Sequence, residues 1–110
     1  MQASNLSEVI TVIAQIVRFK SRLSDEQVLE MYRARAPRYQ SLSGLVEKYY
    51  LKFSETGEHG AVYLWDSEEA MRDFRTSDLA RTIPDAYQVE GAPDVQTAAL
   101  VMTLRSESRS

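Results

Sequence analysis

The stretch Gly60–Phe74 reads GAVYLWDSEEAMRDF, and its character changes halfway along. Up to Trp65 it is uncharged and almost wholly apolar, which is typical of a strand that is buried on both faces. Ser67 then offers a hydroxyl N-cap before two acidic residues, which the helix dipole favours in a first turn. The stretch therefore predicts a strand, Gly60–Asp66, that leads directly into a helix.

The residues after this cap predict which side of the helix is buried. Ala70, Met71 and Phe74 follow at the spacing of a buried helical stripe. Glu68 and Arg72 are four positions apart, as in an ion pair on the exposed side. The helix is therefore expected to pack against the strand that precedes it.

A second strand is expected just before this one. Gly44–Phe53 (GLVEKYYLKF) is rich in strand-forming residues, and the SETGEHG that follows has Gly57 and Gly60 at positions that can take a positive φ. The two strands are therefore predicted to form a hairpin.

The N-terminal part predicts another strand and another helix. Glu8–Phe19 (EVITVIAQIVRF) is rich in β-branched residues, and Ser24–Gln27 (SDEQ) matches a capping box. The helix is expected to end before Pro37, because a proline disfavours the helical conformation of the residue before it. The apolar residues at helical spacing are Val28, Leu29, Met31, Tyr32 and Ala36.

The C-terminal part predicts a long connection and a last strand. The connection, Thr76–Ala92, is interrupted by proline and glycine, yet it contains apolar side chains with which it can dock: Leu79, Ile83 and Tyr87. We expect it to form an ordered lid or wall of a pocket, since connections of this length are usually functional or disordered. Val95–Leu104 (VQTAALVMTL) predicts the last strand.

The order strand, helix, strand, strand, helix, strand predicts a ferredoxin-like α+β domain, with a four-stranded antiparallel sheet and both helices on one face. In the first strand both alternating sets are apolar, with Ala14 and Ile16 on one side and Val17 and Phe19 on the other. A sheet face in water would alternate with polar residues. The same face of a second copy is therefore expected to cover it in a homodimer, and which set faces the partner is left open.

Composition narrows the class of partner and the location. The 110 residues carry a net charge of −3 and a pI of about 5.1, so neither a nucleic acid nor an anionic membrane is expected as partner. The absence of cysteine excludes disulfides and thiolate chemistry. No segment resembles a membrane span or a signal peptide, so a cytoplasmic location is expected. One domain, residues 8–105, is expected between flexible ends, residues 1–7 and 106–110.

These segments also resemble a known family. GLVEKYYL, followed after the glycine turn by GAVYLWDSEEAMRDF, is similar to the dimeric α+β-barrel proteins of the mono-oxygenase family named after the bacterial protein YdhR, relatives of the antibiotic-biosynthesis monooxygenases. The similarity runs from the first strand to the last. Where relatives have Gly-Gly before the third strand, this chain has His59-Gly60. Such barrels host oxygenases, isomerases, cyclases and proteins of no known reaction, so the resemblance specifies fold more than activity.

The resemblance implies a pocket that holds an electron-rich phenol or quinol, which itself reacts with dioxygen without metal, flavin or nicotinamide. By this analogy Trp65 and Tyr63 line the pocket, and a tyrosine, arginine or histidine steers the proton. The catalytic candidates are therefore His59, Tyr63 and Arg35. Buried tyrosine hydroxyls and an indole N–H supply directed hydrogen bonds in an otherwise apolar pocket. The substrate-binding candidates are Trp65, Tyr49, Tyr32, Tyr39 and Tyr87.

Several of these residues also have a purely structural interpretation. His59 is interpreted as a solvated turn residue or as a proton-transfer group. Glu47 is interpreted as a rim carboxylate or a buried acid, Lys48 as a rim charge or partner of Glu47, and Asp66 as a strand end. The arginines of MYRARAPRY form either a solvated helix face or an anion clamp: Arg33, Arg35 and Arg38.

Two classes of function follow from this sequence. The first is a cofactor-independent oxygenase, or an isomerase or cyclase, acting on a small aromatic or polyketide-like substrate. The second is a non-catalytic dimeric module that binds a hydrophobic ligand. A cavity with directed polar groups between sheet and helices would favour the first class over the second.

Overall fold

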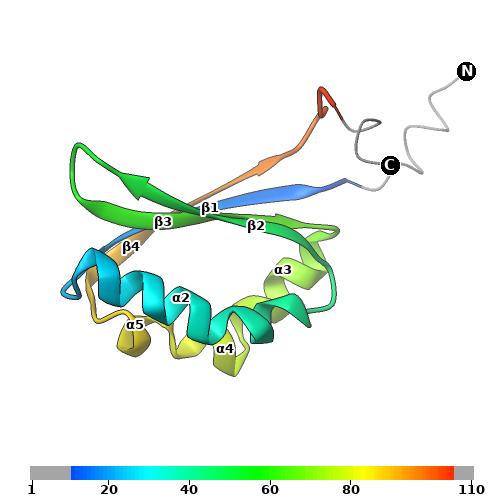
Figure 1. Cartoon of the computed structure of the whole chain (residues 1–110). Helices are drawn as coiled ribbons and strands as arrows, with labels where there is room; N and C mark the ends of the chain where they lie inside the picture. The colour runs from blue at the N-terminus through cyan, green and yellow to red at the C-terminus, as the bar shows by residue number, and fades with distance from the viewer. Residues whose placement is uncertain (1–10, 106–110) are drawn as a thin grey trace, which may run out of the picture.

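The computed structural model describes residues 11–105, which form four strands and four helices. The strands are β1 (Ile13–Ser21), β2 (Leu45–Phe53), β3 (Glu58–Trp65) and β4 (Val89–Ala99). The helices are α2 (Asp25–Gln40), α3 (Glu68–Arg75), α4 (Asp78–Arg81) and α5 (Ile83–Ala86). The strands form one antiparallel sheet in the order β2-β3-β1-β4, and the helices all lie on one of its faces (Figure 1). This is the ferredoxin-like arrangement that the sequence predicts.

Helix α2 begins at the predicted capping box. The Ser24 hydroxyl accepts from the Gln27 N–H at 3.1 Å, and the Gln27 side chain accepts from the Ser24 N–H at 2.9 Å. Within the predicted apolar stripe, Val28 is buried, but Leu29 is 44% exposed. The helix therefore starts where predicted, but fewer of its apolar residues are buried than the predicted stripe contains.

The predicted end of α2 before Pro37 is wrong. The helix continues through Pro37 to Gln40. A proline inside a helix costs about 3 kcal/mol, because it removes one hydrogen bond and crowds the preceding turn. The additional turn places Tyr39 in the core, where its ring packs against Tyr63 and Phe74. Burial of this aromatic ring offsets the cost of the proline.

The predicted β2–β3 hairpin is confirmed, with a shorter turn than predicted. Gly57 takes a positive φ of 79° in the turn, whereas His59 and Gly60 already belong to β3. Gly60 is required for space, because a Cβ there would lie 2.2 Å from the carbonyl oxygen of Val17 on β1. The predicted positive φ of Gly60 and the solvated turn position of His59 are therefore wrong.

In the second half of the chain the helices and strands come in the predicted order, but the last strand has different bounds. The Ser67 hydroxyl caps α3 by accepting from the Ala70 N–H at 3.0 Å, and Arg72 lies 3.4 Å from Glu68, both as predicted. The predicted connection contains α4, α5 and the start of β4. The last strand is Val89–Ala99, where Val95–Leu104 was predicted. It begins earlier because β1, its pairing partner, extends to Ser21.

The two edge strands each contain an irregularity. The β2–β3 pairing shifts between Leu45 and Glu47 of β2. The β1–β4 pairing shifts between Arg18 and Lys20, so that the β4 segment around Pro93 bulges. A proline is tolerated at such a place, because an edge strand needs only one side of its ladder.

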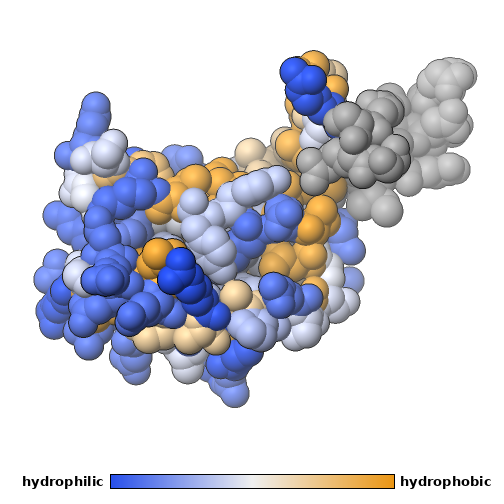
Figure 2. Space-filling view, viewed as in Figure 1, coloured by the Kyte–Doolittle hydropathy of each residue, from blue (hydrophilic) through white to orange (hydrophobic). Residues whose placement is uncertain are grey.

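The strand register settles which side chains share a face. Gln15 pairs with Tyr63 and Val17 with Ala61, on the face that the helices cover. Ala14 and Ile16 therefore lie on the opposite face, which none of the helices between residues 11 and 105 covers (Figure 1). Beyond β4 the chain leaves the plane of the sheet (Figure 1), and Figure 2 shows apolar surface on this projecting part. Its exposed apolar side chains are Val101, Met102 and Leu104.

Some predictions concern residues that the structure does not describe. The predicted flexible ends, residues 1–7 and 106–110, and the predicted start of the first strand at Glu8 lie outside the described residues. Within the description, β1 begins at Ile13. Of the helices in residues 11–105, none has the length and apolar character needed to cross a membrane.

Candidate functional site

An apolar cavity of about 180 Å³ lies between the helix-bearing face of the sheet and the helices. Strands β1, β3 and β4 line one side of it, and all four helices contribute to the other side. Its wall includes six aromatic side chains: Phe19, Tyr32, Tyr39, Tyr63, Phe74 and Tyr87. The segment predicted as a wall also lines it, through Ala80, Ile83, Pro84 and Tyr87.

Two phenol hydroxyls at this cavity have no hydrogen-bond partner within residues 11–105. They belong to Tyr32 and Tyr39, and both oxygens are buried. A buried polar group without a partner is costly, so a ligand or a water molecule that reached either hydroxyl would be stabilised there. Tyr32 and Tyr39 thus belong to the cavity lining and carry buried hydroxyls that lack a partner in this part of the chain.

Three of the cavity tyrosines are held in their protonated form. Burial raises the pKa of Tyr32 to about 12, and the neighbouring Tyr50 and Tyr39 act in the same direction. Burial also raises the pKa of Tyr63 and of Tyr87. At neutral pH these three hydroxyls therefore keep their protons, so they can donate hydrogen bonds to a ligand and do not act as bases.

Tyr63 and Trp65 lie on the same face of β3, as their alternation predicts. Their rings stack with centres 5.8 Å apart and an angle of 6° between the planes. Tyr63 lines the cavity, whereas Trp65 is fully buried beside it and donates its indole N–H to Gln15 Oε1 at 2.9 Å. Gln15 also lines the cavity, and the sequence analysis missed it. A single amide between apolar neighbours, in the stretch from Ile13 to Val17, is the signal that could have found it.

Arg35 is buried and ties helix α2 to the α4–α5 segment. Its Nη2 donates to the Leu79 carbonyl oxygen at 2.7 Å and to the Thr82 hydroxyl at 3.1 Å. Arg33 and Arg38 are exposed, so the three arginines form neither a fully solvated face nor an anion clamp. Arg35 is not part of the cavity lining and positions the wall instead.

His59 lies in a groove at the start of α2, away from the cavity lining. Its Nε2 is 3.2 Å from Asp25 Oδ1, which also accepts from Lys52 Nζ at 2.7 Å. Burial lowers the pKa of His59, and Lys52 lowers it further, while Asp25 acts in the opposite direction. The imidazole Nδ1 is buried without a partner in the described part of the chain. The neutral imidazole is the form that this environment favours.

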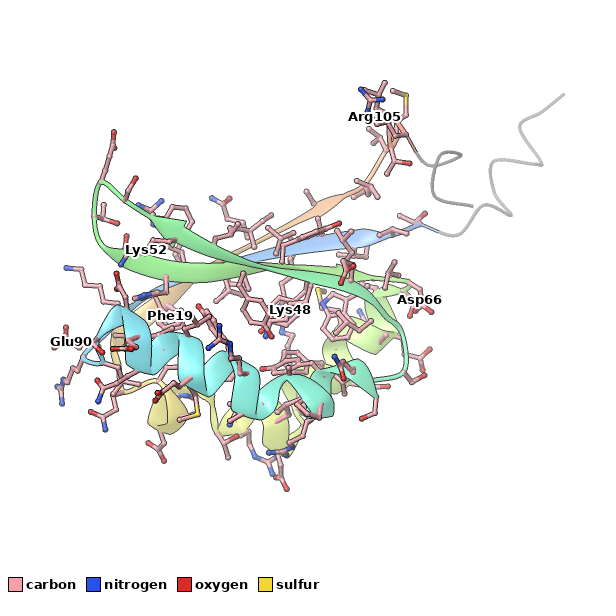
Figure 3. All side chains as sticks on the ribbon, in the orientation of Figure 1. Phe19, Lys48, Lys52, Asp66, Glu90 and Arg105 are labelled. Carbon is pink, nitrogen blue, oxygen red and sulfur yellow. The ribbon has the colours of Figure 1, made fainter. Side chains whose placement is uncertain are left out.

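Lys48 is half-buried on the edge strand β2, and its side chain lies below the sheet among tyrosine rings (Figure 3). Its Nζ is 3.4 Å from the centre of the Tyr39 ring and 4.6 Å from those of Tyr50 and Tyr63. Burial, followed by the charge of Arg35, lowers the pKa of Lys48 to about 7. The predicted Lys48–Glu47 side-chain pair is not formed, because the Glu47 carboxylate accepts from the Lys48 backbone N–H at 3.0 Å.

The cavity brings together four of the eight predicted site residues: Tyr32, Tyr39, Tyr63 and Tyr87. It does not include His59, Arg35, Trp65 or Tyr49. Tyr49 pairs with Val62 on the face opposite the helices, and Asp66 is exposed where β3 ends. Across residues 11–105, no three His, Cys, Asp or Glu side chains gather to form a metal site. The catalytic and binding roles of the predicted residues stay predictions.

No protein-family model and no curated protein matches the chain. Solved structures match its fold. A "putative antibiotic biosynthesis monooxygenase" from Caulobacter crescentus has a TM-score of 0.70 and 14% identity, over 90% of this chain and 99% of that chain. A variant of SnoaB, a cofactor-independent oxygenase from Streptomyces nogalater, has a TM-score of 0.68 and 13% identity, over 86% and 97%. A dimeric ferredoxin-like protein of unknown function from Thermobifida fusca has a TM-score of 0.66 and 14% identity, over 82% and 92%.

These likenesses establish the ferredoxin-like fold. At the level of fold they also agree with the family resemblance that the sequence carries, since one neighbour is named as an antibiotic biosynthesis monooxygenase.

Proposed function

We propose that the chain is a cofactor-independent oxygenase that acts, as a homodimer, on a small aromatic, quinol or polyketide-like substrate. The observation that carries this proposal is the apolar cavity with the unpartnered hydroxyls of Tyr32 and Tyr39. Two buried donors in an apolar wall suit a flat molecule with one or two oxygen atoms. SnoaB, which has the same fold, is named as a cofactor-independent oxygenase.

The size of the cavity narrows the substrate. A dry cavity of about 150 Å³ holds benzene. The cavity of about 180 Å³ therefore accommodates one ring with small substituents. A fused-ring polyketide requires the α4–α5 wall to move outward, which makes that wall the element that controls substrate size.

The proposed reaction draws its electrons from the substrate. In a quinol, one ring C–H becomes C–OH and the two phenolic carbons become C=O, while one atom of dioxygen enters the ring and the other leaves as water with two hydrogens from the substrate. The Tyr32 and Tyr39 hydroxyls donate hydrogen bonds to the substrate oxygen and stabilise the negative charge that develops on it. The apolar wall excludes bulk water from the reacting carbon.

The proposed dimer is formed through the uncovered face of the sheet. That face presents apolar side chains from three strands: Ala14, Ile16, Tyr49, Leu51, Val62 and Leu64. A self-complementary apolar face is most simply covered by its own copy about a two-fold axis. The neighbour from Thermobifida fusca is named as dimeric, which supports this arrangement.

We place the protein in the cytoplasm.

A non-catalytic binding module is the second candidate. It is favoured by the positions of His59 and Arg35, which lie outside the cavity lining and so leave the lining without a group that titrates near neutral pH. An isomerase or cyclase on the same scaffold requires such a group as its proton donor or acceptor.

Thermal unfolding with a panel of quinols and phenols tests the proposal. A ligand at 100 times its Kd raises the free energy of unfolding by about 2.7 kcal/mol. Each binder is then tested for protein-dependent oxygen uptake after chelator treatment, with protein-free buffer as the control for autoxidation. Uptake supports the oxygenase, and binding without uptake supports the module. If no member of the panel binds, the cavity is not a phenol site and the proposal fails.

A further inference from the structure

We propose that Lys48 is a nucleophilic amine that forms an imine with small aromatic aldehydes and ketones. Its Nζ lies 3.4 to 4.6 Å from the centres of three tyrosine rings. The residue borders a groove of about 310 Å³ on the outer side of Tyr39, which provides access from solvent. This proposal goes beyond the oxygenase reaction and does not depend on it.

The surroundings of Lys48 lack a free anion that would stabilise its charged form. The charged and titratable groups around it are Arg35 and Tyr39 of α2, Glu47 and Tyr50 of β2, and Tyr63 of β3. Of these only Glu47 is an anion, and its carboxylate is engaged by a backbone N–H. Within residues 11–105, the ammonium forms no salt bridge.

Two effects on the charge of Lys48 oppose each other. The tyrosine faces attract a cation. Burial, followed by the guanidinium of Arg35, acts against the cation and lowers the pKa of Lys48 to about 7. A lysine with this pKa is about half neutral amine at pH 7, whereas an ordinary lysine is about one part in several thousand.

The chemical step is balanced without an external oxidant or reductant. The amine lone pair attacks the carbonyl carbon, the carbonyl oxygen takes up a proton, and the carbinolamine loses water to leave a C=N bond. The aromatic ring of the carbonyl compound can lie against the tyrosine rings at the same time. An aromatic carbonyl compound is therefore favoured over an aliphatic one.

The chain offers its own control, since its only other lysines are Lys20 and Lys52. Lys52 Nζ donates to Asp25 at 2.7 Å and to the Gly57 carbonyl oxygen at 3.1 Å, so it represents a lysine held as an ammonium ion. Labelling of Lys20 and Lys52 therefore measures how ordinary lysines of the same folded chain react under the conditions used for Lys48.

The test is reductive trapping on the full chain. The folded protein is treated with 4-hydroxybenzaldehyde and cyanoborohydride at pH 7, and the adducts are located by peptide mass spectrometry. We expect the adduct at Lys48 to exceed those at Lys20 and Lys52 by at least about tenfold, because the neutral fractions differ by about a thousandfold. Lys48→Arg should lose this adduct, and Lys52→Arg should retain it.

Two further measurements decide the outcome. Unfolding in urea should abolish the preference for Lys48, and the labelling of Lys48 in the folded chain should rise with a midpoint near pH 7. Equal labelling of the three lysines, or labelling of Lys48 that begins only near pH 9, overturns the proposal. So does a Lys48 that stays unmodified while the α-amino group reacts.

Discussion

Gln15 of β1 and Trp65 of β3 are joined by a buried hydrogen bond of 2.9 Å, from the indole N–H to the amide oxygen. The bond occupies the indole donor, so Trp65 does not present it to a ligand. It also fixes the Gln15 amide in the cavity wall, next to Tyr63. Trp65 therefore affects the cavity through the two residues that it holds in place.

Trp65→Phe should destabilise the fold by about 1–3 kcal/mol, because it leaves the Gln15 oxygen buried without a donor. Urea unfolding measures this change. The double variant with Gln15→Met removes both partners and should recover part of the loss. Equal stability of Trp65→Phe and the wild type would show that the hydrogen bond contributes nothing to folding.

Gly60→Ala should destabilise the fold by about 3 kcal/mol or more, because backbone atoms of β1 and β3 must separate to admit the methyl group. The nearest atom, the Val17 carbonyl oxygen, would be 2.2 Å away. Gly57→Ala is the control: its Cβ meets no atom within 4 Å, and only its φ of 79° opposes the substitution, at about 1–2 kcal/mol. A larger loss for Gly57→Ala than for Gly60→Ala contradicts the explanation.

Arg35→Met should loosen the cavity wall, because it removes the charged hydrogen bonds to Leu79 and Thr82. Such bonds contribute about 1.5–3 kcal/mol, so amide exchange between residues 81 and 87 should become at least about tenfold faster. Arg33→Met, at an exposed position of the same helix, is the matched control and should leave exchange unchanged. If these amides already exchange in the wild type as fast as the C-terminal residues, the segment is not an ordered wall.

The lowered pKa of Lys48 predicts how stability depends on pH. Between a folded-state pKa of about 7 and the ordinary value of 10.5, the unfolded chain binds more protons, so the free energy of unfolding rises with pH. Over pH 7 to 9 we expect a rise on the order of 1 kcal/mol, reduced from the full value because Lys48 is partly accessible to water.

Lys48→Met should abolish this rise, which chemical denaturation at each pH measures. The range lies above the titration of His59, whose lowered pKa makes stability fall only below about pH 6.5. It also lies below the tyrosines, whose raised pKa values have the opposite effect above about pH 10. An unchanged slope in Lys48→Met would assign the pH dependence to another group.

Ile16→Asp should convert the proposed dimer into a monomer of reduced stability, because it places a carboxylate on the uncovered sheet face. Sedimentation at micromolar concentration measures the change. Leu29→Asp, at an exposed apolar position on α2, is the control and should remain dimeric. A wild-type chain that sediments as a folded monomer removes the basis for the dimer.

The sequence predicts the features that depend on neighbours in the chain. Hydroxyl caps at Ser24 and Ser67 and the turn at Gly57 depend on residues within one turn, and all three are as predicted. Alternation also places Tyr63 and Trp65 on one face of their strand. Local sequence patterns were sufficient to predict these features, because the tertiary packing favours the same local conformations.

The features that the sequence did not predict depend on distant residues. Helix α2 passes through Pro37 because Tyr39 reaches rings on β3 and α3. From the sequence alone Lys48 is interpreted as a surface charge, because the three tyrosines around it come from three different elements. In the sequence Gln15 is a polar residue between apolar ones, and its partner Trp65 is distant along the chain. The four tyrosines of the cavity lining were therefore predictable from the sequence, whereas its amide, Gln15, was not.

The irregular pairing in both edge strands affects how copies of this chain can aggregate. A regular edge with a row of free N–H and C=O groups allows another chain to add as a further strand, which is how ordered fibrils grow. In β2 the ladder is interrupted between Leu45 and Glu47, and in β4 Pro93 contributes no N–H within the bulge. Strand addition is thereby disfavoured at both sides of the sheet. A destabilised variant such as Gly60→Ala is accordingly expected to precipitate as amorphous material and not as amyloid.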